Sequence, residues 1–109
     1  MKRKLEISSQ KDGNAVRVSA SGEVDMEASP RLLEAIREEL KQGAEVRLDL
    51  KGVTYMDSSG IAVLVQGVKL ARKEKARFTL VEPSPSVFAV IKLSQLLDFF
   101  SIERSGGAG

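Results

Sequence analysis

One short turn in the sequence places an acid, two hydroxyls and a glycine between two apolar stretches. Asp57, Ser58, Ser59 and Gly60 follow an apolar run that ends at Met56 and precede an amphipathic stretch. A serine in such a turn can act as a nucleophile, accept a phosphoryl group or cap a helix. A cap needs only one residue of this kind, and here there are three. Glycine in a first helical turn also weakens the helix by up to about 1 kcal/mol, but it permits close approach by another chain.

The residue types in the chain exclude most catalytic chemistry at this turn. The sequence has no histidine and no cysteine, so a Ser-His-Asp triad, a histidine-ligated zinc ion and a thiolate metal site are impossible. A nucleophile elbow needs glycine where Met56 stands. An aspartyl phospho-acceptor at Asp57 needs an acidic cluster where Ser8, Ser9 and Gln10 end the first strand. We therefore expect no catalytic residue, no metal site and no cofactor, and a chain that is not an enzyme.

Charge and hydropathy exclude two further classes. The formal net charge is only +2, which is too small to indicate nucleic-acid binding, and few aromatic rings are present for base stacking. No apolar stretch reaches the roughly 20 residues needed to span a bilayer, so we expect no direct membrane insertion. The basic N-terminus has no apolar h-region and is not expected to be a signal peptide. These features favour a cytoplasmic protein.

The elements that position the turn can be predicted from the spacing of apolar residues. Alternation predicts two strands over 4–10 and 14–21, joined by the hairpin signal Asp12-Gly13. The other predicted elements are a helix from Ser29-Pro30 to Gly43, a strand over 45–50, a helix from Ser58 or Ser59, a strand over 77–83, a helix from Ser84-Pro85, and a short helix or extended piece over 96–102.

This order, ββαβαβα, predicts an α/β fold in a single domain. We expect a four- to five-stranded mixed β-sheet with helices packed mainly on one face, because a hairpin is followed by parallel crossovers. The predicted core consists of Val16, Val18, Ile36, Val46, Leu48, Leu50, Leu64, Val68, Leu80 and Ile91.

Three stretches of the sequence together resemble a known family. They are "GEVD" at 22–25, "VTYMDSSGIAVL" at 53–64 and "FTLVEPSPSVFAVIKLSQLLDFF" at 78–100. In this order they resemble a STAS domain, and more narrowly the bacterial anti-sigma factor antagonists. The resemblance extends over nearly the whole chain. We therefore expect a STAS domain over 1–103 and a flexible C-terminal tail over 104–109.

The resemblance implies a phosphorylation-dependent partner switch. The unphosphorylated protein would bind an anti-sigma factor that is a GHKL-type serine protein kinase, and so release a sigma factor. The kinase would then phosphorylate Ser58, the first serine after the aspartate, which abolishes binding, and a PP2C-type phosphatase would reverse this. Ser59 is expected to turn inward or cap the helix. The implied partner-binding residues are Glu23, Asp25, Met56, Asp57, Ser58, Ser59, Gly60 and Ala62.

The sequence also departs from the family pattern and leaves an alternative open. The family often has Gly-Leu-Gly after the serines, whereas this chain has Gly60-Ile61-Ala62. The methyl group of Ala62 leaves less room for a partner to approach the helix closely. Other STAS proteins are subunits of bacterial ABC-type lipid-transport permeases. In that alternative, the same turn docks onto permease and ATPase subunits, and phosphorylation need play no part.

Overall fold

The computed structural model describes residues 3–105, and these form the predicted order of strands and helices. The final segment, predicted as a short helix or an extended piece, contains one of each. The elements are β1 (Glu6–Asp12), β2 (Ala15–Val24), α1 (Ser29–Lys41), β3 (Glu45–Met56), α2 (Ser58–Glu74), β4 (Phe78–Val81), α3 (Pro85–Leu93), a 3-10 turn η1 (Leu97–Phe99) and β5 (Ser101–Glu103).

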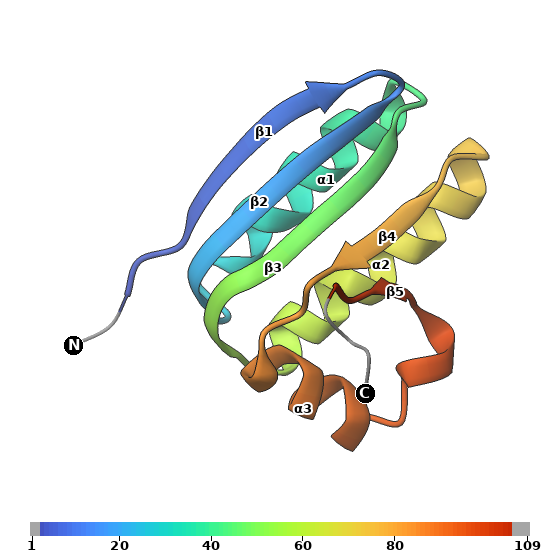
Figure 1. Cartoon of the computed structure of the whole chain (residues 1–109). Helices are drawn as coiled ribbons and strands as arrows, with labels where there is room; N and C mark the ends of the chain where they lie inside the picture. The colour runs from blue at the N-terminus through green and yellow to red at the C-terminus, as the bar shows by residue number, and fades with distance from the viewer. Residues whose placement is uncertain (1–2, 106–109) are drawn as a thin grey trace.

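The strands form one five-stranded mixed sheet in the order β1-β2-β3-β4-β5. β1 pairs antiparallel with β2, and every other pairing is parallel. α1 and α2 lie side by side over one face, while α3 lies near the end toward which the parallel strands run (Figure 1). Each parallel crossover must carry its helix back across the sheet, which places α1 and α2 on the same side. The predicted α/β class and mixed sheet are confirmed.

β2 alternates between buried and half-buried residues along its whole length. The hairpin turn before it lies where Asp12-Gly13 predicted it, and Gly13 has a φ of +65°, which glycine adopts without strain. β2 continues three residues beyond the predicted end at position 21 and includes Glu23. Glu23, one of the implied partner-binding residues, therefore lies in the last part of this strand.

β3 is longer than the sequence pattern predicted. The predicted strand covered 45–50, whereas β3 continues to Met56 and has 12 residues opposite the 10 of β2. The two extra residues are accommodated at two register shifts, one beside Ser19–Ser21 and one beside Gly22-Glu23. A bulge of this kind interrupts the alternation of side chains, so the second half of β3 does not read as a strand. With the two bulges, β3 stays paired with β2 as far as Met56, directly before the Asp57 turn.

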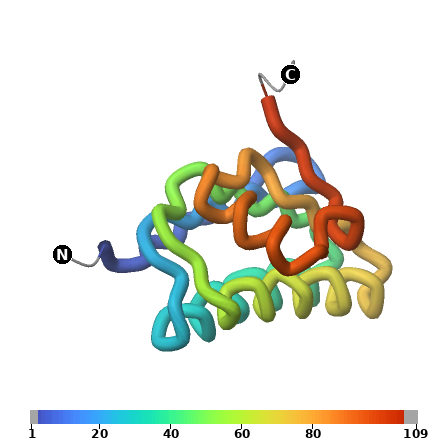
Figure 2. Tube along the Cα trace, turned by 90° about the horizontal axis from the view of Figure 1, so that it is seen from below, coloured from blue at the N-terminus to red at the C-terminus, as the bar shows by residue number. Residues whose placement is uncertain are grey.

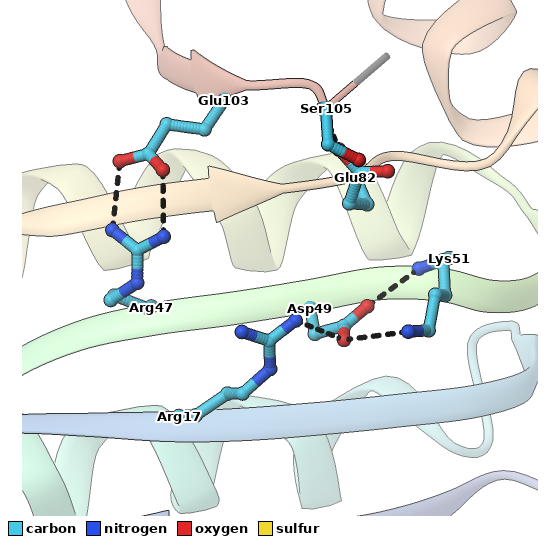
Figure 3. Close-up of polar contacts among 7 residues, drawn as sticks. All are labelled: Arg17, Arg47, Asp49, Lys51, Glu82, Glu103 and Ser105. Atoms are coloured by element: carbon cyan, nitrogen blue, oxygen red, sulfur yellow. Dashed lines mark hydrogen bonds and ion pairs between the residues drawn. The ribbon is translucent and has the colours of Figure 1, made fainter. Parts of the chain in front are cut away.

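A buried carboxylate supports the first bulge. The Asp49 carboxylate accepts hydrogen bonds from the Lys51 backbone N–H at 3.0 Å and from the Arg17 guanidinium at 2.8 Å (Figure 3). The Asp49 side chain is only 6% exposed, although α1 and α2 lie on the other face of the sheet (Figure 3). Burial raises the pKa of Asp49, but the Lys51 N–H and the Arg17 guanidinium outweigh it and hold the pKa below its ordinary value.

Asp49→Asn should therefore destabilise the fold in a pH-dependent way. The folded-state pKa lies below the unfolded value of about 3.9, so the stabilisation is present at neutral pH and is lost as the pH falls through the folded-state pKa. We expect a loss of about 1–2 kcal/mol at pH 7, because one partner of a charge-assisted hydrogen bond becomes neutral. Urea unfolding at pH 7 and pH 3 should show this deficit shrinking at the lower pH.

Glu103→Gln is the matched control for that prediction. Glu103 forms a bidentate ion pair with Arg47 (Figure 3). Its side chain is 54% exposed, so solvent screens the pair and it contributes little to stability. This variant should unfold close to the wild-type urea concentration at pH 7. A deficit for Asp49→Asn that grows as the pH falls would contradict the assigned role of its charge.

The core between the sheet and the two helices contains nine of the ten predicted residues in buried positions. Val68 is the exception, because it is only partly buried. It lines a groove of about 320 Å³ between the second half of α2 and Phe99. Helical spacing places Val68 on the apolar side of α2, but it cannot show that the opposing layer is incomplete at this end of the helix.

The predicted cap of the first helix is wrong, whereas that of the third helix is confirmed. The Ser84 hydroxyl accepts a hydrogen bond from the Val87 N–H at 3.2 Å and caps α3. Ser29 is instead already inside α1, and its own side chain is buried. Ala28 is the N-cap residue and α1 has no side-chain cap, but the Asp25 carboxylate accepts a hydrogen bond from the Ala28 N–H at 2.9 Å. An acid four residues before Ser29 therefore closes the turn that leads into α1.

Part of the predicted C-terminal tail contacts the domain. The Arg104 guanidinium lies 4.2 Å from the centre of the Phe88 ring. The Ser105 N–H donates to the Glu82 carboxylate (Figure 3). The rest of the predicted tail, 106–109, lies outside the described residues. In residues 3–105, no helix is long and apolar enough to cross a membrane.

Candidate functional site

The Asp57–Gly60 turn lies where β3 ends, beside the end of β2. The Asp57 N–H donates to the Val24 carbonyl oxygen at 3.3 Å, which joins the turn after β3 to the loop after β2. Figure 2 looks onto this end of the molecule and shows the two connections next to each other. In α/β folds, loops at the carboxyl ends of parallel strands are the usual place for binding residues.

Asp57 is the N-cap of α2. Its backbone is extended, with φ −104° and ψ −169°, and its carboxylate accepts hydrogen bonds from the Ser59 N–H at 2.9 Å and from the Ser59 hydroxyl at 2.5 Å. Its carbonyl oxygen accepts from the N–H groups of Gly60 and Ile61. Of the two roles expected for Ser59, capping is therefore wrong, because the preceding acid holds that position and binds Ser59 as well.

The two serines of the turn differ in exposure and in hydrogen bonding. Ser58 is exposed, and within residues 3–105 its hydroxyl has no hydrogen-bond partner. Ser59 is half-buried, and its hydroxyl donates to the Asp57 carboxylate. A reagent that approaches from solvent therefore meets a free hydroxyl at Ser58. At Ser59 it would first have to break a charge-assisted hydrogen bond.

Two expected contact residues support the turn from beneath. Met56 is 3% exposed, and Gly60 is buried. A β-carbon added to Gly60 would lie 2.4 Å from the Met56 side chain and 3.0 Å from Val24, so the glycine lets α2 pack closely on the sheet. Met56 and Gly60 thus support the turn from within the domain, and their contact with a partner stays a prediction. Ala62 is exposed, one turn into the helix, and remains on the surface.

Glu23 and Asp25 lie half-buried on the neighbouring strand and loop. The Glu23 carboxylate accepts a hydrogen bond from the Arg3 N–H at 3.2 Å, and the Glu23 N–H donates to the Arg3 carbonyl oxygen at 3.0 Å. The Asp25 carboxylate accepts from the Ala28 N–H. Both acids are therefore held in place by the backbone, and the structure brings them to the same end of the sheet as Asp57.

Two exposed apolar residues at this end were not predicted as part of the site. Met26 is 78% exposed in the loop after β2, and Tyr55 is 48% exposed near the end of β3. Tyr55 is the sheet partner of Glu23, so it also lies beside the turn. The sequence did offer one indication of their role, because Met26 directly follows Asp25 and Tyr55 directly precedes Met56. The sequence alone could not show that these two side chains avoid the core.

The start of α2 can accommodate an added negative charge. The positive end of the α2 dipole favours an anion, including a phosphoryl group on Ser58. The nearby carboxylates of Asp57 and Glu23 would give a phosphorylated turn a concentrated negative charge. In the described part of the chain, no three acids gather into a set that would hold a metal ion.

Comparisons with known sequences identify the family. The family model described as "Mlab, STAS domain" matches residues 7–101. The anti-sigma-B factor antagonist of Bacillus subtilis is 29% identical over 105 residues, which cover 96% of each chain. The anti-sigma-B factor antagonist of Listeria monocytogenes is 30% identical over 99 residues, which cover 90% of this chain and 87% of that protein.

Solved structures show the same fold. An anti-sigma factor antagonist from Mycobacterium paratuberculosis superposes with a TM-score of 0.83 at 26% identity, covering 92% of this chain and 86% of that one. The antagonist SpoIIAA in its unphosphorylated form gives a TM-score of 0.77 at 22% identity, covering 94% and 90% of the two chains. The sequence match, the relatives and the shared fold agree, and this chain belongs to the STAS domain family.

Proposed function

We propose that this protein is an anti-sigma factor antagonist that works by a phosphorylation-dependent partner switch. In its unphosphorylated form it binds an anti-sigma factor that is a GHKL-type serine protein kinase, and a sigma factor is released. Phosphorylation at Ser58 abolishes binding, and a PP2C-type phosphatase restores it. The antagonist identity is supported by the two similar proteins from Bacillus subtilis and Listeria monocytogenes, both of which are anti-sigma-B factor antagonists. Such a switch acts on the transcription machinery and therefore operates in the cytoplasm.

The single observation that carries the proposal is the contrast between the two serines. Ser58 presents a free hydroxyl at the N-terminus of α2, while the Ser59 hydroxyl is bound to Asp57. A substrate serine must enter the active site of a kinase, which requires exposure. It requires no catalytic group from this chain, so we propose a binding protein that performs no turnover of its own.

The physical basis of the switch is the charge that phosphorylation adds. A phosphoryl group contributes about −1.5 to −2 charge at neutral pH. It would be added next to Asp57 and near Glu23 and Asp25, on the surface that we propose contacts the partner. Like charges brought together across an interface cost several kcal/mol. Binding is then lost without any refolding of the domain.

The proposed contact surface consists of side chains that the structure leaves accessible. Asp57, Ser58 and Ala62 come from the α2 end, and Glu23 and Asp25 come from the neighbouring strand and loop. Met56 and Gly60 shape this surface from below, and Ser59 fixes the orientation of Asp57. A kinase that covers Ser58 would therefore also cover both loops.

Three variants test the proposal through binding to the purified kinase. Ser58→Ala should remain folded and bind permanently, because it cannot be phosphorylated. Ser58→Asp should fold but bind at least about tenfold more weakly, a loss of roughly 1.4 kcal/mol. Ser59→Ala should bind like the wild type but lose about 1 kcal/mol of stability, since one hydrogen bond to Asp57 disappears. Calorimetric titration and urea unfolding measure the two effects separately.

A Ser58→Asp protein that binds the kinase as tightly as the wild type would contradict the proposed switch. Loss of kinase binding in Ser59→Ala, with Ser58→Ala and Ser58→Asp unaffected, would show that Ser59 rather than Ser58 contacts the kinase. In the first case the alternative STAS role, as a subunit that docks onto an ABC-type permease and its ATPase, would become the better explanation of the same surface.

A further inference from the structure

The loop between β2 and α1 presents a methionine to solvent. Met26 is 78% exposed, and its position is fixed by the turn around it. The Asp25 carboxylate accepts from the Ala28 N–H at 2.9 Å, and the Asp25 carbonyl oxygen accepts from the Ser29 N–H at 2.8 Å. Met26 therefore stands at the tip of a closed turn rather than in a loose loop.

This methionine lies close to the proposed phospho-acceptor. Val24 is bonded through its carbonyl oxygen to the Asp57 N–H at 3.3 Å. Met26 is two residues beyond Val24, Ser58 is one residue beyond Asp57, and consecutive Cα atoms are about 3.8 Å apart. Tyr55, 48% exposed, approaches the same area from β3. Two large, exposed apolar residues therefore lie at the same end of the sheet as the serine, Met26 in the loop after β2 and Tyr55 near the end of β3.

The charges around Met26 are mostly negative. Glu23, Asp25 and Glu27 surround it in the sequence, and Asp57 lies across the hydrogen bond between the two connections. The nearest cation along α1, Arg31, donates its guanidinium N–H to the Leu5 carbonyl oxygen at 3.2 Å. An apolar side chain set among acids fits an apolar pocket with a basic rim. It fits poorly against an anionic lipid surface or against an identical acidic surface of a second copy.

We infer that Met26 is the apolar anchor of the partner-binding surface and enters an apolar pocket with a basic rim on the anti-sigma kinase, an inference that rests on the proposed function. A flexible, polarisable thioether is well suited to fill such a pocket. Anchors of this kind carry a large share of the binding free energy of an interface, while the residues around them exclude water. Tyr55 supplies further apolar contact beside Glu23.

Met26→Gln tests the inference, because glutamine has a similar length and shape but a polar end. The probe is a panel of purified GHKL-type serine kinases from the source organism, each titrated calorimetrically. Leu93→Gln is the matched control, since Leu93 is an equally accessible apolar residue, 83% exposed, at the end of α3. We expect Met26→Gln to raise the Kd at least about tenfold and Leu93→Gln to leave it unchanged. Both side chains are exposed, so thermal unfolding should be unaffected in both variants.

The other outcomes separate this inference from the proposed function. If Met26→Gln binds the kinase as tightly as the wild type, Met26 is not the anchor, but the proposed partner switch still stands. An equal loss in Leu93→Gln would also overturn it, because the contact would then not be specific to this surface. Sedimentation that shows a wild-type dimer, dissociated by Met26→Gln, would make a second copy the occupant instead. No binding of the wild type to any kinase of the panel would remove the function and the anchor together.

Discussion

Replacing Gly22 by alanine should destabilise the domain by about 2–4 kcal/mol, because strain and overpacking add at this position. Gly22 has a φ of +96°, and an added β-carbon would lie 2.3 Å from the Lys4 carbonyl oxygen and 2.9 Å from the Lys4 carbonyl carbon. Both obstructing atoms belong to the backbone, so no side-chain rotation relieves the clash. The first residue of the "GEVD" stretch is therefore a glycine because the N-terminal segment, Arg3–Leu5, crosses it.

The same substitution should also disturb the proposed contact surface. The backbone of Arg3 exchanges two hydrogen bonds with Glu23, and Leu5 is buried in the core at 2% exposure. Displacing this segment releases the Glu23 carboxylate. Gly13→Ala is the control, since Gly13 also has a positive φ of +65° but would meet nothing within 4 Å. Urea unfolding should show a clearly larger loss for Gly22→Ala. Equal losses would mean that the crossing segment moves away without cost.

Leu48→Ala should cost about 2–5 kcal/mol of unfolding free energy. Leu48 is 0% exposed at the centre of β3, and its sheet partners Val18 and Leu80 are equally buried. The substitution deletes buried side-chain carbons together with their packing contacts, and it leaves a cavity that the neighbouring strands cannot fill. Leu93→Ala, at an 83% exposed leucine, should change stability by less than about half a kcal/mol. A loss of only a few tenths for Leu48→Ala would contradict the packing described for β3.

The sequence predicted those parts of the fold that depend on local pattern. Strict alternation in β2 and the Ser84-Pro85 start of α3 are local signals, and both elements begin within one residue of the predicted position. The second half of β3 could not be predicted in this way. Its two bulges depend on which residues of β2 lie opposite, and on the Asp49 carboxylate that binds both Lys51 and Arg17. Alternation carries no information about either contact.

The candidate site could be found from its motif, but its internal roles could not. The motif placed the serine turn at the start of a helix, yet Ser59 and Asp57 are both good caps in isolation. The packing of Gly60 against Met56 involves neighbours on adjoining elements, so the burial of both residues follows from the tertiary structure. The exposure of Met26 likewise depends on how the Asp25 turn closes.

The most direct test of the partner switch compares two forms of the same wild-type chain. The kinase is allowed to phosphorylate the protein, and mass spectrometry of the peptides locates the phosphate. The unphosphorylated and phosphorylated forms are then titrated into fresh kinase by calorimetry. The partner switch predicts phosphate on Ser58 alone and binding at least about tenfold weaker after phosphorylation, equivalent to a loss of roughly 1.4 kcal/mol. Phosphate on Ser59, or equal affinity of the two forms, would contradict it.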